Sequence, residues 1–493
     1  MSTRTNRPGQ PFAGVLAFFR ELGLLPNLIL GAAVVVLIGL QIPAVVDGTG
    51  EAGEIARNIL SCLALVGMGV GSYVAWPSRW NIPAHLQVAF AIPAYVLPLL
   101  GLDVFGTWDN DLVILYTRLV GYGFVAMTAG TLIGRVLVDR FFGEKREAAV
   151  RGLVVRAAVD APRRVLVVSV ASVIVLIVCF AVMGFVPALT ADPGAAKFFK
   201  GIYHEPYEQV SIPYRFVTTL IPVLLPIVGV YAWTRRRKVW WIVILAATIG
   251  VMLLCLLREP AVSGALIALG VVLAYYKRFF IAYLAALIAV YVAGSALYVI
   301  LALLGFSQYE SVIKSGQNLM SSIASGAPDI PDQLKLLAAW LPNYELTLGR
   351  TFVGGLIPGN FEWNPSVWTL TTLNPTTDIE EIRSGGLRLP APVWGYVSFD
   401  WVGAIVVALL SGVIIGILAR GGARLLPGLS LETAAMLMVV YLAAVEVFPA
   451  FYRLSYLSVL GLILVLVLFF VRVPARWQRR RSGEPALSNG DVD

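Results

Sequence analysis

Cysteine and histidine are scarce in this sequence. Three cysteines and two histidines occur among 493 residues. Each cysteine lies inside an apolar run without C-x-x-C spacing, so the sequence predicts neither a disulfide framework nor a zinc site. No GxxxxGKS/T phosphate loop occurs, which argues against ATP as the energy source. Asp109 and Asp111 form an acidic pair of a kind that can bind divalent cations, but a solvated acidic loop is its commoner origin. We expect no cofactor and no metal.

Charged residues are also few. They make up 13% of the chain against 58% for hydrophobic residues, and the mean hydropathy is +0.82. A soluble domain has about 25% charged residues. The sequence therefore predicts an all-α polytopic membrane protein. The net charge is +8, and most of the basic residues lie in short clusters between apolar runs, as in cytoplasmic loops. We therefore expect this protein to contact membrane lipid, and we do not expect it to bind nucleic acid.

Apolar runs long enough to cross a bilayer recur along the chain. A membrane-spanning helix needs about 20 mainly apolar residues. The sequence predicts twelve spans, at 27–46, 58–76, 85–101, 112–134, 165–187, 213–233, 239–257, 261–276, 279–304, 394–419, 431–450 and 454–472.

The loops between these spans differ in charge. Basic segments at 135–164, 234–238 and 419–424 alternate with the acidic or mixed loops 47–54 and 305–393. Loops rich in Lys and Arg stay in the cytoplasm. We therefore predict a multi-pass protein of the cytoplasmic (inner) membrane with both termini cytoplasmic.

This topology divides the chain into four parts. They are an N-terminal bundle of about nine spans (1–304), a large extracytoplasmic loop with short helices (305–393), three C-terminal spans (394–473) and a basic, disordered tail (474–493). Within the first part, residues 138–164 form a basic amphipathic segment. It either lies on the anionic inner leaflet or is an ordinary solvated connecting helix.

Several arginines fall in or next to the predicted outer loops, although positively charged residues usually favour the cytoplasmic side. They are Arg215, Arg258, Arg350, Arg383, Arg388 and Arg453. A guanidinium group can bind a phosphate with two parallel donors. We predict that Arg258, Arg215, Arg350 and Arg388 bind a lipid diphosphate. The structural alternative for Arg258 is an interfacial side chain that reaches toward lipid headgroups or pairs with Glu259.

Aromatic residues are dense in the large outer loop. Trp363, Trp394 and Tyr396 are the candidates for binding a glycan, because the C–H faces of sugars stack on aromatic rings. Trp and Tyr are also the usual residues of the membrane interface, which accounts for part of this enrichment.

Two stretches of this region resemble the Wzy-type O-antigen polymerases, a family of oligosaccharide repeat-unit polymerases. They are GRTFVGGLIPGNFEWNPSVW and GGLRLPAPVWGYVSFDWVGAIV. The matching residues are Gly349, Thr351, Gly354, Gly355, Pro358 and Trp363 in the first stretch and Tyr396, Phe399, Trp401 and Gly403 in the second. LLREPAVSGALIAL also looks like the family's arginine motif, at Arg258. The sequence departs from the family pattern at Gly359, Trp394 and Asp400, where the family has an arginine, an acidic residue and a glycine.

The resemblance implies a glycosyltransferase similar to the GT-C enzymes. Such an enzyme would polymerise undecaprenyl-diphosphate-linked oligosaccharides on the outer face of the membrane, with the lipid diphosphate as leaving group. A chain-length regulator is a further candidate partner. The alternatives are an O-antigen ligase or another glycosyltransferase that uses a lipid carrier, and a transporter or lipid-linked sugar flippase.

Glycosyl transfer needs a base to accept the proton of the attacking hydroxyl group. The candidates are Asp400, at the start of a predicted span, His204, in an outer loop, and Glu259. Glu362 is a weaker alternative, and Glu446 either serves the pocket or pairs with Arg453.

Overall fold

The computed structural model describes residues 50–97, 108–235, 238–277, 279–303, 329–358, 361–376, 379 and 386–471. Across these ranges every regular element is a helix, which confirms the predicted all-α class for this part of the chain. The predicted span 27–46, the predicted tail 474–493 and Arg383 lie outside the described residues.

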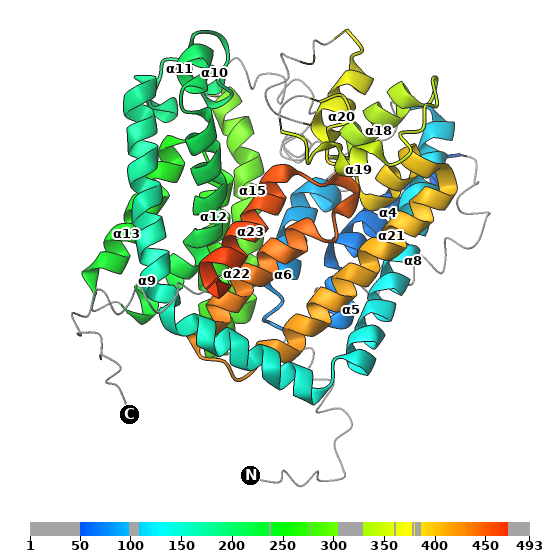
Figure 1. Cartoon of the computed structure of the whole chain (residues 1–493). Coiled ribbons are helices and arrows are strands. Elements are labelled where there is room, and N and C mark those ends of the chain that lie inside the picture. Colours follow the sequence, from blue (N-terminus) through cyan, green and yellow to red (C-terminus); the bar gives the residue numbers. More distant parts are fainter. Residues whose placement is uncertain are drawn as a thin grey trace, which may run out of the picture.

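The helices form two lateral groups, a central pair and a cap (Figure 1). The first group contains α4 (Glu51–Val70), α5 (Ser72–Ala75), α6 (Ile82–Ala91) with the π-helix η1 (Ile92–Val96), α8 (Asn110–Phe141) and α21 (Ala391–Leu425). The second contains α9 (Glu144–Met183), α12 (Ser211–Thr234), α13 (Val239–Leu254), α14 (Arg258–Tyr276) and α15 (Phe280–Leu303). The central pair is α22 (Leu431–Val447) and α23 (Tyr456–Phe470), joined through the 3-10 helix η6 (Phe451–Arg453).

Short helices lie at one end of the bundle. The cap consists of α18 (Asp329–Trp340), α19 (Arg350–Gly354) and α20 (Pro365–Leu373), and it covers the first group. The second group carries η2 (Pro187–Leu189), α10 (Pro193–Lys197), η3 (Gly201–Tyr203) and α11 (His204–Glu208) at the same end.

Six of the described helices are long and apolar enough to cross a membrane. They are α4, α8, α9, α12, α14 from Glu259 onward, and α21. Four shorter apolar helices cover Ile82–Val96, Val239–Leu254, Phe280–Gly294 and Tyr456–Phe470. These helices indicate a membrane protein.

Glycines allow α8 and α21 to pack with their backbones in contact. A Cβ atom at Gly130 would lie 2.1 Å from the carbonyl oxygen of Leu409, and one at Gly412 would lie 2.1 Å from that of Met127. Gly134 and Gly416 make equivalent close approaches one turn further on. Both helices thus carry a Gly-x-x-x-Gly pattern, which is typical of close helix pairs in membranes.

The long helix α9 changes direction near Pro162. Proline lacks a backbone N–H and clashes with the carbonyl group of the preceding turn, so it bends a helix. The first half of α9 lies across the end of the bundle opposite the cap, and the second half runs along the second group (Figure 1). The first half covers most of the predicted amphipathic segment 138–164, whose first residues belong to α8, and it buries Val154 and Ala161 against the bundle.

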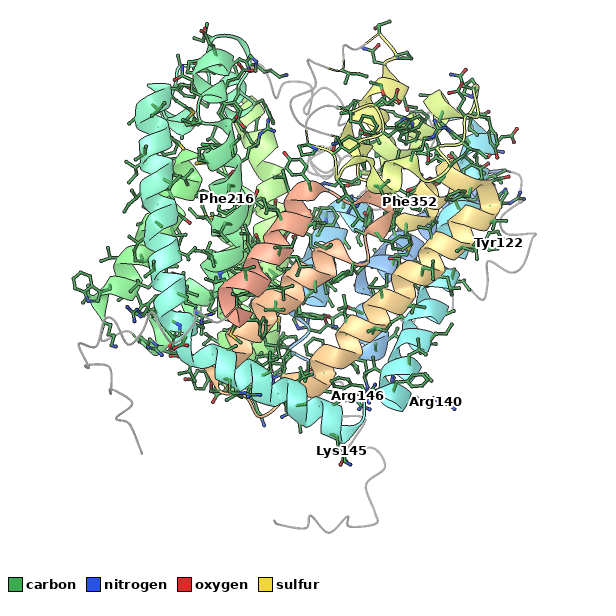
Figure 2. All side chains as sticks on the ribbon, viewed as in Figure 1. Tyr122, Arg140, Lys145, Arg146, Phe216 and Phe352 are labelled. Carbon is green, nitrogen blue, oxygen red and sulfur yellow. The ribbon has the colours of Figure 1, made fainter. Side chains whose placement is uncertain are left out.

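Basic side chains connect the helices at this end of the bundle through hydrogen bonds. Arg151 donates a hydrogen bond to the carbonyl oxygen of Pro427 at 2.9 Å, and Arg164 donates to that of Val471 at 2.8 Å. Asp139 accepts from Arg420 at 2.8 Å and from Arg424 at 2.7 Å. Figure 2 shows Arg140, Lys145 and Arg146 at the same end.

Candidate functional site

A cavity of about 840 Å³ lies between the two lateral groups and the central pair. Its described lining includes five charged side chains: Glu259, Asp329, Arg388, Glu446 and Arg453. The other lining residues are largely apolar. Asp329 is buried and the other four are exposed, and charged residues within a membrane bundle commonly mark a functional site. This cavity is therefore the candidate functional site.

Arg388 reaches the cavity from the segment that leads from the cap into α21. Its guanidinium carbon lies 5.6 Å from the centroid of the Phe90 ring, and its carbonyl oxygen accepts a hydrogen bond from Gln333 of α18 at 3.0 Å. Gln333 in turn accepts a hydrogen bond from Tyr116 of α8. The cap and α8 thus fix the backbone that carries Arg388.

Asp329, the first residue of α18, lies beside this arginine. It is 5% exposed, and its burial raises the pKa of its carboxyl group above the ordinary value. The positive charge of Arg388 acts in the opposite direction and lowers that pKa. Asp329 is not among the residues predicted from the sequence, because a single acidic residue in a long loop carries no signal for burial.

The central pair supplies Glu446 and Arg453 to the cavity. Glu446 lies in the last turn of α22 and accepts a hydrogen bond from the Ser458 hydroxyl at 3.5 Å, and it interacts electrostatically with Arg453. Arg453 ends η6, and the chain after it is held by α19, since the Leu454 N–H donates to the carbonyl oxygen of Phe352 at 3.1 Å. The cavity thus holds two guanidinium groups and several carboxylates.

Two of the predicted diphosphate-binding residues lie in or next to α14 and α12. Arg258 begins α14 directly before Glu259, but its side chain lies outside the described part of the structure. Arg215 is in the first turn of α12, and its guanidinium group donates to the Tyr207 hydroxyl at 2.6 Å and to the Tyr456 hydroxyl at 3.5 Å. The next turn of α12 lines the cavity, so Arg215 lies beside the rim and not in the lining.

Arg350, the remaining predicted diphosphate-binding residue, is an exposed residue of the cap. It begins α19, and its guanidinium carbon lies 4.8 Å from the centroid of the Trp363 ring. Arg350 and Arg215 are both absent from the described lining of the cavity. Of the three predicted arginines whose side chains the structure describes, only Arg388 belongs to this lining.

The three predicted bases are far from one another in the fold. Glu259 lines the cavity. His204 lies on α11 above the second group, where its Nε2 is 3.0 Å from a carboxylate oxygen of Glu208. Asp400 lies in α21 on the opposite side and is absent from the described lining. The geometry thus favours Glu259 and Glu446 over the other two as bases for chemistry in the cavity.

Asp400 lies at a break within α21. Phe399 has φ −147° and ψ 28°, and Asp400 has φ 57° and ψ −153°, a conformation that glycine adopts more readily than any other residue. The Asp400 carboxylate accepts a hydrogen bond from the N–H of Trp401 at 2.7 Å. The structure thus gives the carboxylate a local structural partner at a position whose backbone conformation suits glycine.

The predicted glycan-binding aromatics mostly belong to the core beneath the cap. Trp394 is 1% exposed and lies 5.5 Å from Trp368, centroid to centroid, while Tyr396 is 4% exposed. Neither ring offers an open face to a sugar. Trp363 is half-buried and is covered on one face by Arg350.

Comparisons with protein-family models, curated proteins and solved structures found no match for this chain.

Proposed function

We propose that the protein is a GT-C-like glycosyltransferase that polymerises undecaprenyl-diphosphate-linked oligosaccharide repeat units. The observation that carries this proposal is the cavity, whose largely apolar lining includes the exposed side chains of Arg388, Arg453, Glu259 and Glu446. A lipid diphosphate brings at least two negative charges to the bilayer, and these must be neutralised by such donors. The resemblance of the cap sequence to the O-antigen polymerases supports the same substrate class.

The proposed setting is the cytoplasmic (inner) membrane, crossed by twelve spans with both termini cytoplasmic. The basic contacts at the end opposite the cap support this orientation, since positive residues favour the cytoplasmic side. The cap and the cavity beneath it then belong to the extracytoplasmic side, where lipid-linked repeat units are joined.

The proposed reaction is a direct displacement at the anomeric carbon. A hydroxyl group of the acceptor glycan forms the new C–O bond, and the bond from the anomeric carbon to the diphosphate oxygen breaks. The electron pair leaves with the diphosphate, where Arg388 and Arg453 stabilise the developing negative charge. The hydroxyl proton passes to a carboxylate, for which Glu446 and Glu259 are the two candidates.

The test uses purified protein in lipid with a single lipid-linked repeat unit and no nucleotide sugar. The proposal predicts a ladder of products that differ by one repeat unit. Glu446→Gln or Glu259→Gln removes the proton acceptor and lowers kcat by about 100-fold or more, as expected for the loss of a general base. Glu205→Gln, on the exposed surface of α11, serves as the matched control and keeps full activity. Folded wild-type protein that forms no ladder would refute polymerisation.

The depth of the cavity favours one second candidate, a lipid-linked sugar flippase or another transporter. The lining extends from Arg388 and Arg453 near the cap to Ser72 and Pro83 in α5 and α6. A passage that reaches so far along the bundle suits a carrier. Translocation of a labelled lipid-linked sugar across vesicles, without elongation, would favour this function. An O-antigen ligase would instead transfer the glycan once to a different acceptor, which the same reaction mixture reveals when that acceptor is added.

A further inference from the structure

We propose that residues 344–357 of the cap, within the predicted extracytoplasmic loop 305–393, form an interfacial segment that inserts into the lipid leaflet nearer the cap. This inference does not depend on the proposed enzymatic function. It rests on the exposed apolar side chains of the segment, its depth along α21 and the hydrogen bonds of its backbone.

The segment exposes an apolar stripe at helical spacing. Val353, Leu356 and Ile357 are 57%, 38% and 47% exposed. The N–H of Leu356 donates to the carbonyl oxygen of Val353 at 2.9 Å, so the helical turn continues past α19. Positions i, i+3 and i+4 of a helix share one face. Leu348, which is 59% exposed, precedes this helix. Such a cluster is unfavourable in water and suits a partner that is itself apolar.

The depth of the segment follows from the charges on α21. Arg420, at the end opposite the cap, is 20 residues after Asp400, and no charged residue lies between them. At about 1.5 Å per residue these residues span about 30 Å, the thickness of the hydrocarbon core. Tyr122 is 52% exposed and its ring lies 6.0 Å from that of Trp401, centroid to centroid, as expected for an aromatic pair at the interface. Asp400 therefore marks the edge of the hydrocarbon layer.

The apolar stripe adjoins this edge. A Cβ atom at Gly349 would lie 3.0 Å from the Phe399 ring, and Phe352 lies 5.9 Å from the same ring, centroid to centroid. Phe399 is 42% exposed, and one turn further α21 exposes Val402 by 71%. Figure 2 shows Phe352 and Tyr122 in the half of the bundle nearer the cap. The exposed surface of the segment thus continues the apolar surface of a candidate span, and lipid is the occupant that both surfaces fit.

The break in α21 supplies hydrogen-bond partners for the irregular backbone of the segment. The N–H groups of Thr347 and Leu348 donate to the carbonyl oxygens of Val397 and Ser398 at 3.0 and 3.2 Å. A regular helix would use these two carbonyl oxygens within α21. On the other side, the N–H of Tyr456 donates to the carbonyl oxygen of Gly355 at 2.8 Å. Irregular backbone is tolerated next to lipid only where its polar groups are satisfied by protein.

The test is a depth measurement by spin labelling of the full chain in lipid nanodiscs. A single cysteine is introduced at Val353 or Leu356, with Val402 as the lipid-facing reference and Asn374, an exposed residue at the end of α20, as the water-facing reference. The three native cysteines are buried and stay in place, and unsubstituted protein gives the background.

The proposal predicts that labels at Val353 and Leu356 collide readily with oxygen and poorly with a water-soluble nickel chelate, as at Val402. Labels that meet the nickel chelate as readily as the one at Asn374 would show a water-exposed loop and overturn the proposal. Labels shielded from both reagents would show a protein partner on the stripe and would also overturn it. None of these outcomes depends on polymerase activity.

Discussion

Replacement of Arg388 by alanine tests whether the cavity binds the diphosphate. Arg388 lines the cavity, whereas Arg350 stacks on Trp363 outside the described lining, although the sequence predicts both as diphosphate ligands. Arg350 lies in the cap at the same end of the bundle, so Arg350→Ala is a matched control. Only the Arg388 variant is expected to lose affinity for the lipid-linked donor.

The expected loss follows from the hydrogen bonds that a guanidinium group makes to a phosphate. A hydrogen bond to a charged group contributes about 1.5–3 kcal/mol, so loss of the bidentate pair costs about 3 kcal/mol, or roughly 150-fold in affinity. Arg388→Lys keeps the charge but loses the planar pair of donors, and a loss of about tenfold is expected. Arg350→Ala loses only a cation–π contact, which contributes about 0.5–1 kcal/mol to local stability.

The neighbouring carboxyl group requires a second variant. Arg388→Ala leaves Asp329 buried without the positive charge that lowers its pKa most, and this loss lowers the amount of folded protein. The double variant Arg388→Ala/Asp329→Asn removes this unpaired charge, so it is expected to restore the protein level without restoring donor affinity. The KM for the lipid-linked repeat unit is measured by the formation of the product ladder. Equal KM values for wild-type protein, Arg388→Ala and the double variant would refute the assignment.

Three further predictions concern the cavity, the break in α21 and the contact between α8 and α21. Because burial raises the pKa of Asp329, its carboxyl group ionises only as the pH rises through that raised value, and the anion then competes with the diphosphate for Arg388. The KM of Asp329→Asn should therefore match the wild-type KM in acid and fall below it as the pH increases; a constant ratio would contradict this account. Asp400→Gly should relieve about 1–2 kcal/mol of backbone strain, raise the midpoint of thermal unfolding and keep activity, whereas inactive but folded protein would assign the carboxylate to catalysis. Gly412→Ala should lower the free energy of unfolding by about 1–3 kcal/mol because no space exists for a Cβ atom, whereas Gly421→Ala, with no atom within 4 Å of the added Cβ, should not; equal stability would contradict the described helix contact.

The membrane character and the positions of most helices could be predicted because they depend on local composition. An apolar run of about 20 residues indicates a membrane span, whichever elements pack against it. The bend of α9 was also visible in principle, since Pro162 lies within the predicted amphipathic segment 138–164. The glycine pairs of α8 and α21 carry a recognisable Gly-x-x-x-Gly spacing that the sequence analysis did not use.

The composition of the cavity could not be predicted in the same way. Glu259, Asp329, Arg388, Glu446 and Arg453 belong to distant parts of the chain, and only the packing of the helices brings them together. Composition marks a charge near an apolar run as unusual, but it does not say which charges face one another. This is why Arg388 and Glu259 were found while Asp329 was missed.

The break in α21 was not predicted. The sequence predicts one continuous span from 394 to 419 with Asp400 in its first turns, whereas the structure has a helix from Ala391 that is interrupted at Phe399 and Asp400. No proline marks the interruption.

The most direct measurement is an experimental structure of the protein in nanodiscs with bound undecaprenyl diphosphate. The account predicts that the diphosphate lies in the cavity, within hydrogen-bond distance of Arg388 and Arg453, with Glu446 or Glu259 facing the position of the departing sugar. A diphosphate bound instead at Arg350 on the surface of the cap, with the cavity unoccupied, would contradict it.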